Sequence, residues 1–134
     1  MKEKLDEKSK EALVRYRLNR AEEAVSEAEL LSKGSYHNAA INRLYYGGYY
    51  ATSALLLSND ISMSTHDGVK TMLGLHFVST CLFQYEHGHT LSSRLFEIRH
   101  SDEYDFVYCD KAVIGEYIPK TKSFIETVKT VLNS

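Results

Sequence analysis

The chain has 134 residues, with 16 Lys and Arg against 18 Asp and Glu, so its formal net charge is −2. This length predicts one domain with its own core, spanning residues 1–134. The near-neutral charge excludes a general polyanion binder, so any nucleic-acid contact must be a local patch. A hydrophobic fraction of 43% excludes wholesale disorder, and one Pro with seven Gly argues against a loop-rich all-β domain.

The cysteine and hydropathy patterns indicate a cytoplasmic protein. Cys81 and Cys109 lie far apart and form no CxxC pair, which is typical of a reducing compartment. The first residues are charged throughout, unlike a signal peptide. Apolar runs are too short for a membrane-spanning helix, so we expect no membrane association.

Helical periodicity predicts an all-α fold, an up-and-down bundle of four to five main helices. The expected helices span residues 4–31, 35–57, 65–78, 90–99 and 111–132. Gly34 is the expected end of the first helix, and Ser35 is the expected N-cap of the second. Pro119 lies inside the last helix, where we expect a kink.

The second expected helix is apolar on nearly all sides, which predicts a central position in the bundle. Gly47 and Gly48 lie in its interior, where two glycines cost about 2 kcal/mol relative to alanines. We expect the close approach of another helix to offset this cost, with Gly48 facing that helix.

Arg43 lies in the same helix, where an unpaired charge would cost several kcal/mol. One interpretation is structural, an ion pair with an acid of the segment 102–105. The other is functional, with Arg43 binding an anion in a cleft. The residue pattern leaves both interpretations open.

The segment 99–106 is a second candidate site. If the helix continues, Arg99 shares a face with Glu103, and His100 shares one with Tyr104. Such a group could bind phosphate and transfer protons. The structural alternative is a helix C-terminus at which Arg99 and His100 interact favourably with the helix dipole.

Several well-known chemical motifs are absent from the sequence, among them GxxxxGK[ST], GxGxxG, HExxH and GxSxG. We therefore expect no cofactor. His87 and His89 form the one ligand-like spacing, but no third ligand stands near them. They are expected to be solvated loop histidines and not a metal site.

Three segments, in this order, resemble the HEPN family, the "higher eukaryotes and prokaryotes nucleotide-binding" domain. They read AAINRLYYGGYYATSALL, STHDGVKTMLGLHFV and LFEIRHSDEYDF. The chain is most similar to the small stand-alone prokaryotic subgroup, and the resemblance covers about residues 10–132. It implies an up-and-down helical bundle that forms a homodimer, with two Arg-x4-6-His motifs in one cleft.

The resemblance also assigns site residues. Arg99 matches the Arg of the family motif, Tyr104 stands where the motif's His is expected, and His100 is adjacent to Arg99. These three are the candidate catalytic residues. Asn42 and Arg43 match the polar pair of the family's second helix.

The remaining candidate binding residues lie in the centre of the chain. His66 matches the family's third-helix segment. We expect Arg43 and Arg99 to lie near each other, held by Asp102 and Asp105 when no ligand is bound.

Three functions are compatible with these residues. The first is a nucleotide- or RNA-binding HEPN protein that partners a minimal nucleotidyltransferase in a toxin–antitoxin-like pair. The second is a metal-independent endoribonuclease toxin, in which Arg99 stabilises the phosphorane and His100 or Tyr104 donates a proton. The third is a structural dimer without a ligand.

Overall fold

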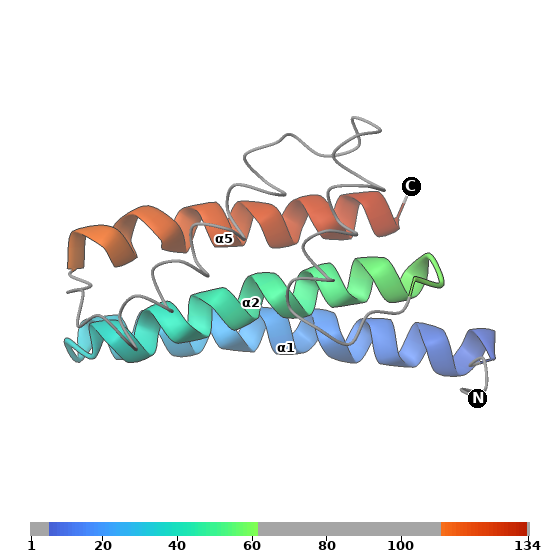
Figure 1. Ribbon diagram of the computed structural model, residues 1–134, viewed down its shortest axis with the longest axis horizontal. Helices are drawn as coiled ribbons and strands as arrows, with labels where there is room; N and C mark the ends of the chain where they lie inside the picture. The colour runs from blue at the N-terminus through green and yellow to red at the C-terminus, as the bar shows by residue number, and fades with distance from the viewer. Residues whose placement is uncertain (1–5, 62–110, 134) are drawn as a thin grey trace.

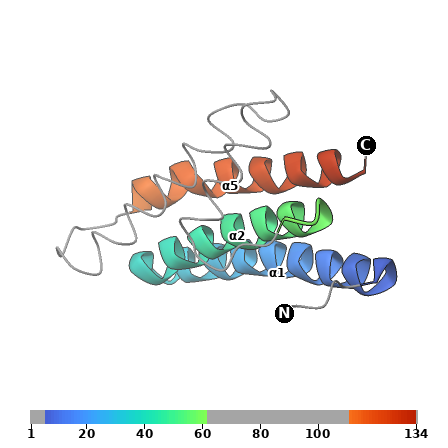
Figure 2. The same cartoon turned by 45° about the vertical axis from the view of Figure 1, so that its right-hand side comes forward.

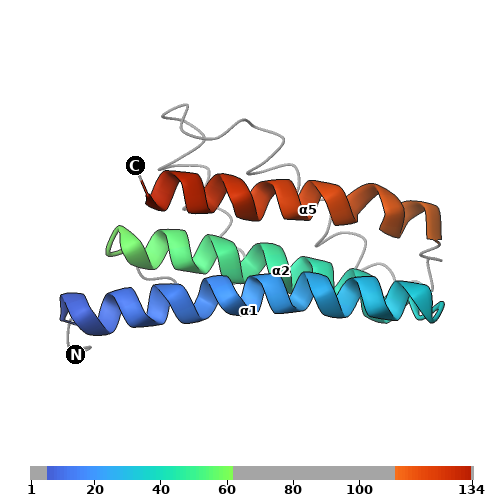
Figure 3. The ribbon, with the colours of Figure 1, turned by 180° about the vertical axis from the view of Figure 1, so that it is seen from behind.

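The computed structural model describes residues 6–61 and 111–133. This part of the chain consists of the helices α1 (Glu7–Lys33), α2 (His37–Ser58) and α5 (Lys111–Leu132), with no strand between residues 6 and 61 or 111 and 133. The three helices lie side by side, and α2 and α5 both run opposite to α1 (Figures 1, 2 and 3). The all-α prediction is confirmed for these residues, whereas the helices expected over 65–78 and 90–99 lie outside them.

Helix α1 begins later than the sequence pattern predicts. The Asp6 carboxylate caps it by accepting a hydrogen bond of 2.7 Å from the Ser9 backbone N–H. This bond to Ser9 lowers the pKa of Asp6. The helix therefore starts at Glu7 instead of Lys4, because the Asp6 side chain accepts from the free Ser9 N–H of the first turn.

The turn between α1 and α2 ends α1 in a Schellman motif, with Gly34 as the C-cap. The Tyr36 N–H donates to the Leu31 carbonyl at 2.9 Å, and the Ser35 N–H donates to the Ser32 carbonyl at 3.0 Å. Ser35 has a φ of 67°. The expected N-cap role of Ser35 is therefore wrong: Tyr36 occupies that position, without a side-chain cap, and Ser35 takes the left-handed position that usually holds glycine.

Small side chains form the contact between α1 and α2. Ala21, Ala24 and Ala28 on α1 are fully buried, as are Ala40 and Ala51 on α2. Without longer side chains between them, the two backbones can approach closely. Larger buried residues of α2 and α5 belong to the same core, namely Ile41, Leu44, Leu55, Ile114, Phe124 and Val128.

Gly47 lies where all three described helices meet. A Cβ atom at this position would lie 3.2 Å from Val25 Cγ2 and 3.4 Å from the Ala21 carbonyl oxygen, both on α1. It would also lie 3.6 Å from Thr121 Cγ2 on α5. The close approach expected at the glycine pair is thus found at Gly47, while a Cβ at Gly48 would meet no atom of the described residues within 4 Å.

Helix α5 spans the predicted residues and continues through Pro119. Two of its lysines pair with acids of α1: Lys122 Nζ lies 2.8 Å from Glu29 Oε1, and Lys129 pairs with Glu22. These ion pairs lie along one edge of the buried alanine stripe of α1. They hold α5 against α1 in addition to the apolar contacts.

We predict that Gly47→Leu lowers the free energy of unfolding by about 1–3 kcal/mol, because the side chain overpacks the meeting point of three helices. Gly47→Ala is the control with a smaller side chain, and we expect it to change stability little. Alanine gains about 1 kcal/mol of helix propensity over glycine. This gain offsets the close contact of its Cβ with Val25, which needs to move by only a few tenths of an ångström. Chemical denaturation measures both. Equal stability of Gly47→Leu and wild type would contradict the close approach.

Ser35→Gly should stabilise the protein by about 0.5–1 kcal/mol, because glycine adopts the left-handed conformation without a Cβ clash. Ser32→Gly is the matched control, since Ser32 lies in the right-handed last turn of α1, where glycine is unfavourable. Thermal melts should show opposite shifts for the two variants. A lower melting temperature for Ser35→Gly would refute the assignment.

Candidate functional site

Two of the predicted site residues, Asn42 and Arg43, lie in the described part of the chain, in the first half of α2. The other predicted site residues lie outside the described residues: Arg99, His100, Tyr104, His66, Asp102 and Asp105. The expected proximity of Arg43 and Arg99 also involves these residues and stays a prediction.

The Arg43 guanidinium is partly buried and is held from three sides. Its Nη2 donates a hydrogen bond of 3.1 Å to Asn42 Oδ1. Its Nη1 lies 3.9 Å from Glu27 Oε1 on α1, and the group lies 5.2 Å from the centre of the Tyr46 ring. Within the described residues the acid beside Arg43 is Glu27. The acids of segment 102–105, which the sequence suggests as partners of Arg43, lie outside the described residues, so that pairing stays a prediction.

Sequence reasoning missed Glu27 because its proximity to Arg43 depends on how two antiparallel helices align. Glu27 falls on the polar side of α1, where the pattern indicates a solvated face. The sequence signal that could have pointed to Glu27 is its spacing from Arg20 and Glu23, because this spacing places all three residues on one edge of the helix. That edge faces the tyrosine-rich side of α2.

We name this surface the Arg–Tyr strip, made of Arg20 on α1 and Arg43, Tyr46 and Tyr50 on α2. The rings of Tyr46 and Tyr50 lie 5.9 Å apart, and the Arg20 guanidinium lies 5.5 Å from the centre of the Tyr50 ring. Each guanidinium therefore lies over an aromatic face, which favours a cation electrostatically. The strip combines two cations with two rings, the groups that proteins use to contact phosphates and bases.

The two arginines of the strip differ in their carboxylate contacts. Arg20 Nη1 donates to Glu23 Oε2 at 2.7 Å. The Tyr50 hydroxyl, and after it Glu23, raises the pKa of Arg20. Arg43 has a longer contact to Glu27, of 3.9 Å, which is beyond hydrogen-bond distance. Arg43 is therefore the arginine of the strip whose carboxylate contact is more easily replaced.

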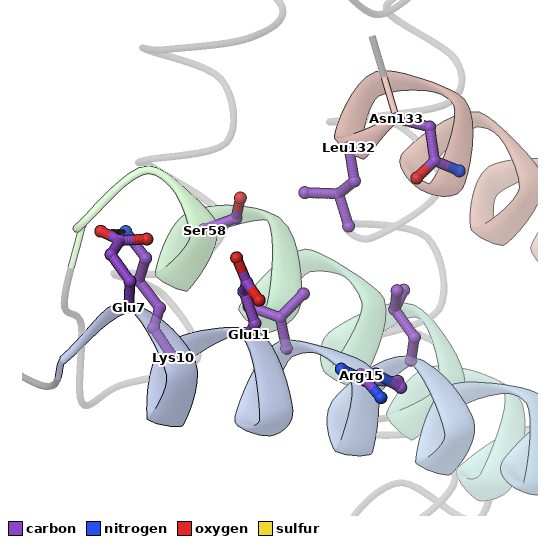
Figure 4. Close-up of a pocket in the computed structure, with 9 residues that line it drawn as sticks. Glu7, Lys10, Glu11, Arg15, Ser58, Leu132 and Asn133 are labelled. Atoms are coloured by element: carbon purple, nitrogen blue, oxygen red, sulfur yellow. Dashed lines mark ion pairs between the residues drawn. The ribbon is translucent and has the colours of Figure 1, made fainter.

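A separate hollow of about 500 Å³ lies at the other end of the helices (Figure 4). Lys10 and Arg15 contribute positive charge to it, and Glu7 and Glu11 contribute negative charge. Lys10 is engaged by Glu7 at 3.1 Å and by Asp60 at 3.3 Å, and the hydrogen bond to Glu7 raises the pKa of Lys10. This balance of charge favours no particular anion or cation, and among the described residues neither Asn42 nor Arg43 lines the hollow.

The part of the chain that the structure describes contains neither a candidate metal site nor a candidate membrane-spanning helix. Between residues 6 and 61 and between 111 and 133, no three His, Cys, Asp or Glu side chains gather closely enough to hold a metal ion. His87 and His89 lie outside these ranges. No described helix combines the length and apolarity of a bilayer crossing.

Comparison with known proteins decides the family. The HEPN domain matches residues 14–131, which is most of the chain. The chain belongs to the HEPN domain family. The matched range includes the Asn42–Arg43 pair and the Arg99 segment, so the resemblance stated from three short segments is confirmed over nearly the full length.

Three relatives of this HEPN protein are similar along most of their own length. A "UPF0332 protein" of Thermotoga maritima is 32% identical over 92% of this chain and 93% of its own. Two proteins of Methanocaldococcus jannaschii, named "Putative toxin MJ0142" and "Putative toxin MJ0605", are 28% and 26% identical. They match 87% and 84% of this chain, and 80% and 83% of their own length.

Arg43→Ala should lower stability by at most about 1 kcal/mol, because the contact with Glu27 is long and half exposed. Removing one partner of a fully buried ion pair would instead cost about 3–5 kcal/mol. The neighbouring change Leu44→Ala, at a fully buried side chain, should cost about 2–5 kcal/mol and shows that the assay detects core damage. A loss for Arg43→Ala as large as for Leu44→Ala would make Arg43 a structural residue.

Proposed function

We propose that this chain is an RNA-binding HEPN protein that acts with a minimal nucleotidyltransferase in a toxin–antitoxin-like pair. The observation that carries the proposal is the similarity to the two M. jannaschii proteins with the printed name "Putative toxin", because it spans 84–87% of this chain and 80–83% of theirs. Overlap of this extent relates whole chains and not a shared fragment. The nucleotidyltransferase follows from the resemblance to the family.

The arrangement around Arg43 supports phosphate binding. Its guanidinium is oriented by Asn42 and by the Tyr46 ring, so less side-chain freedom is lost when an anion binds. Arginine presents planar pairs of N–H donors that match phosphate oxygens. RNA bound there should dissociate as salt is raised, because the contact is to phosphate.

We also propose that the protein acts as a homodimer in which two Arg99 segments share one cleft. This proposal follows from the resemblance to the family, whose members commonly pair and bring two Arg-x4-6-His motifs into one cleft. Light scattering of the purified protein should give the mass of two chains. A concentration-independent mass of one chain would contradict the shared cleft.

We predict that Arg99→Ala abolishes binding of a labelled single-stranded RNA while leaving the melting temperature nearly unchanged. The reason is that an arginine facing a cleft contributes affinity for phosphate but little to the core. Arg15→Ala is the matched control, because it removes the same charge from an exposed position on α1. Fluorescence anisotropy and thermal melts measure binding and stability on the same samples.

The outcomes separate the three functions. RNA binding without cleavage supports the proposal, while cleavage in the presence of a chelator would instead assign a metal-independent endoribonuclease that uses Arg99 with His100 or Tyr104. Unchanged RNA binding in Arg99→Ala, with a large loss of stability, would make Arg99 structural and defeat the proposed cleft. A wild-type protein that binds no RNA would leave a structural dimer.

A further inference from the structure

The two arginines of the Arg–Tyr strip contact carboxylates that differ in origin. The Glu23 carboxylate on Arg20 comes from the same helix, at 2.7 Å. The Glu27 carboxylate beside Arg43 comes from the neighbouring helix, at 3.9 Å. The Arg20–Glu23 contact is a hydrogen bond, whereas 3.9 Å is too long for one, so the acid beside Arg43 is the one more readily exchanged.

We propose that Glu27 acts as an internal competitor that sets the affinity of Arg43 for RNA phosphate. This inference rests on the RNA-binding function proposed above and names a residue that regulates that same site. In the free protein Glu27 lies beside the guanidinium. In the complex an RNA phosphate takes the place of its carboxylate.

The contacts of Arg43 allow this exchange. Asn42 Oδ1 accepts from Nη2, whereas Glu27 approaches Nη1. When Glu27 moves away, the hydrogen bond to Asn42 and the Tyr46 ring still hold the guanidinium in place. Nη1 then offers its N–H groups to an incoming phosphate, in an orientation that the protein has already fixed.

The charges and exposure of these groups explain why Glu27 weakens binding without preventing it. A carboxylate and a phosphate compete for the same donor, because both are anions. At 3.9 Å and with a side chain 47% exposed, Glu27 is partly screened by water and returns to solvent at little cost. The competition therefore lowers RNA affinity by a modest factor.

Glu27→Gln tests the inference, because glutamine keeps the size and the helix propensity of glutamate and removes its charge. Glu23→Gln is the matched control: it makes the same charge change one turn away, beside Arg20. At low salt we expect Glu27→Gln to bind a labelled single-stranded RNA about threefold to tenfold more tightly than wild type, the effect of one competing charge at this distance. Glu23→Gln should change affinity by less than about twofold.

A double variant tests whether the gain in RNA affinity acts through Arg43. Glu27→Gln made in Arg43→Ala should bind RNA no more tightly than Arg43→Ala alone, because the competitor then has no donor to release. Thermal melts of all variants confirm that the samples are folded.

The contrary outcomes are distinct. Equal gains for Glu27→Gln and Glu23→Gln would show a general effect of charge, and weaker binding by Glu27→Gln would show that Glu27 orients Arg43 for RNA. Either result overturns the inference while the RNA-binding function stands. If neither wild type nor Glu27→Gln binds RNA, the proposed function fails and the inference fails with it.

Discussion

The contact at Gly47 is the constraint on which the described arrangement depends. Little room for a side chain is left there, because an added Cβ atom would already contact Val25 and Ala21 of α1 and Thr121 of α5. The buried alanines of α1 extend this close contact along α2. A larger side chain at Gly47 would separate α1 from α2, and every polar contact between the two helices would lengthen.

Close approach brings the polar edges of the helices within reach of each other. Arg17 donates to the backbone carbonyl of Ser53 at 3.3 Å, and Lys10 pairs with Asp60 near the end of α2. Arg43 reaches Glu27 at the other end of the same helix pair. A packing contact in the centre therefore determines electrostatic contacts at both ends.

Four acidic residues in the second half of α1 form two groups with different partners. Glu22 and Glu29 pair with lysines of α5, whereas Glu23 and Glu27 lie beside the arginines of the Arg–Tyr strip. The ion pairs of Glu22 and Glu29 join α1 to α5. Of the other two, Glu23 is hydrogen-bonded to Arg20 at 2.7 Å, whereas Glu27 lies 3.9 Å from Arg43 and is the residue that we propose competes with RNA phosphate.

The sequence by itself determined the all-α class, the extent of α5 and the family. These follow from local properties: helical periodicity, an N-cap signal or a short motif lies within one segment and can be read there. Pro119 did not end α5, since the tertiary packing of a helix outweighs one lost hydrogen bond.

Only the tertiary structure decided which residues meet. The sequence marked both glycines of α2, but only Gly47 faces α1 and α5 within the described residues, because that depends on the rotation of α2 in the bundle. The sequence predicted that Arg43 lies near an anion. That Glu27 is the neighbouring acid depends on how two antiparallel helices align. Ser35 likewise left its expected cap position because the chain reverses there in a left-handed turn. Each of these outcomes depends on contacts between segments, and such contacts leave no mark in the periodicity of either segment alone.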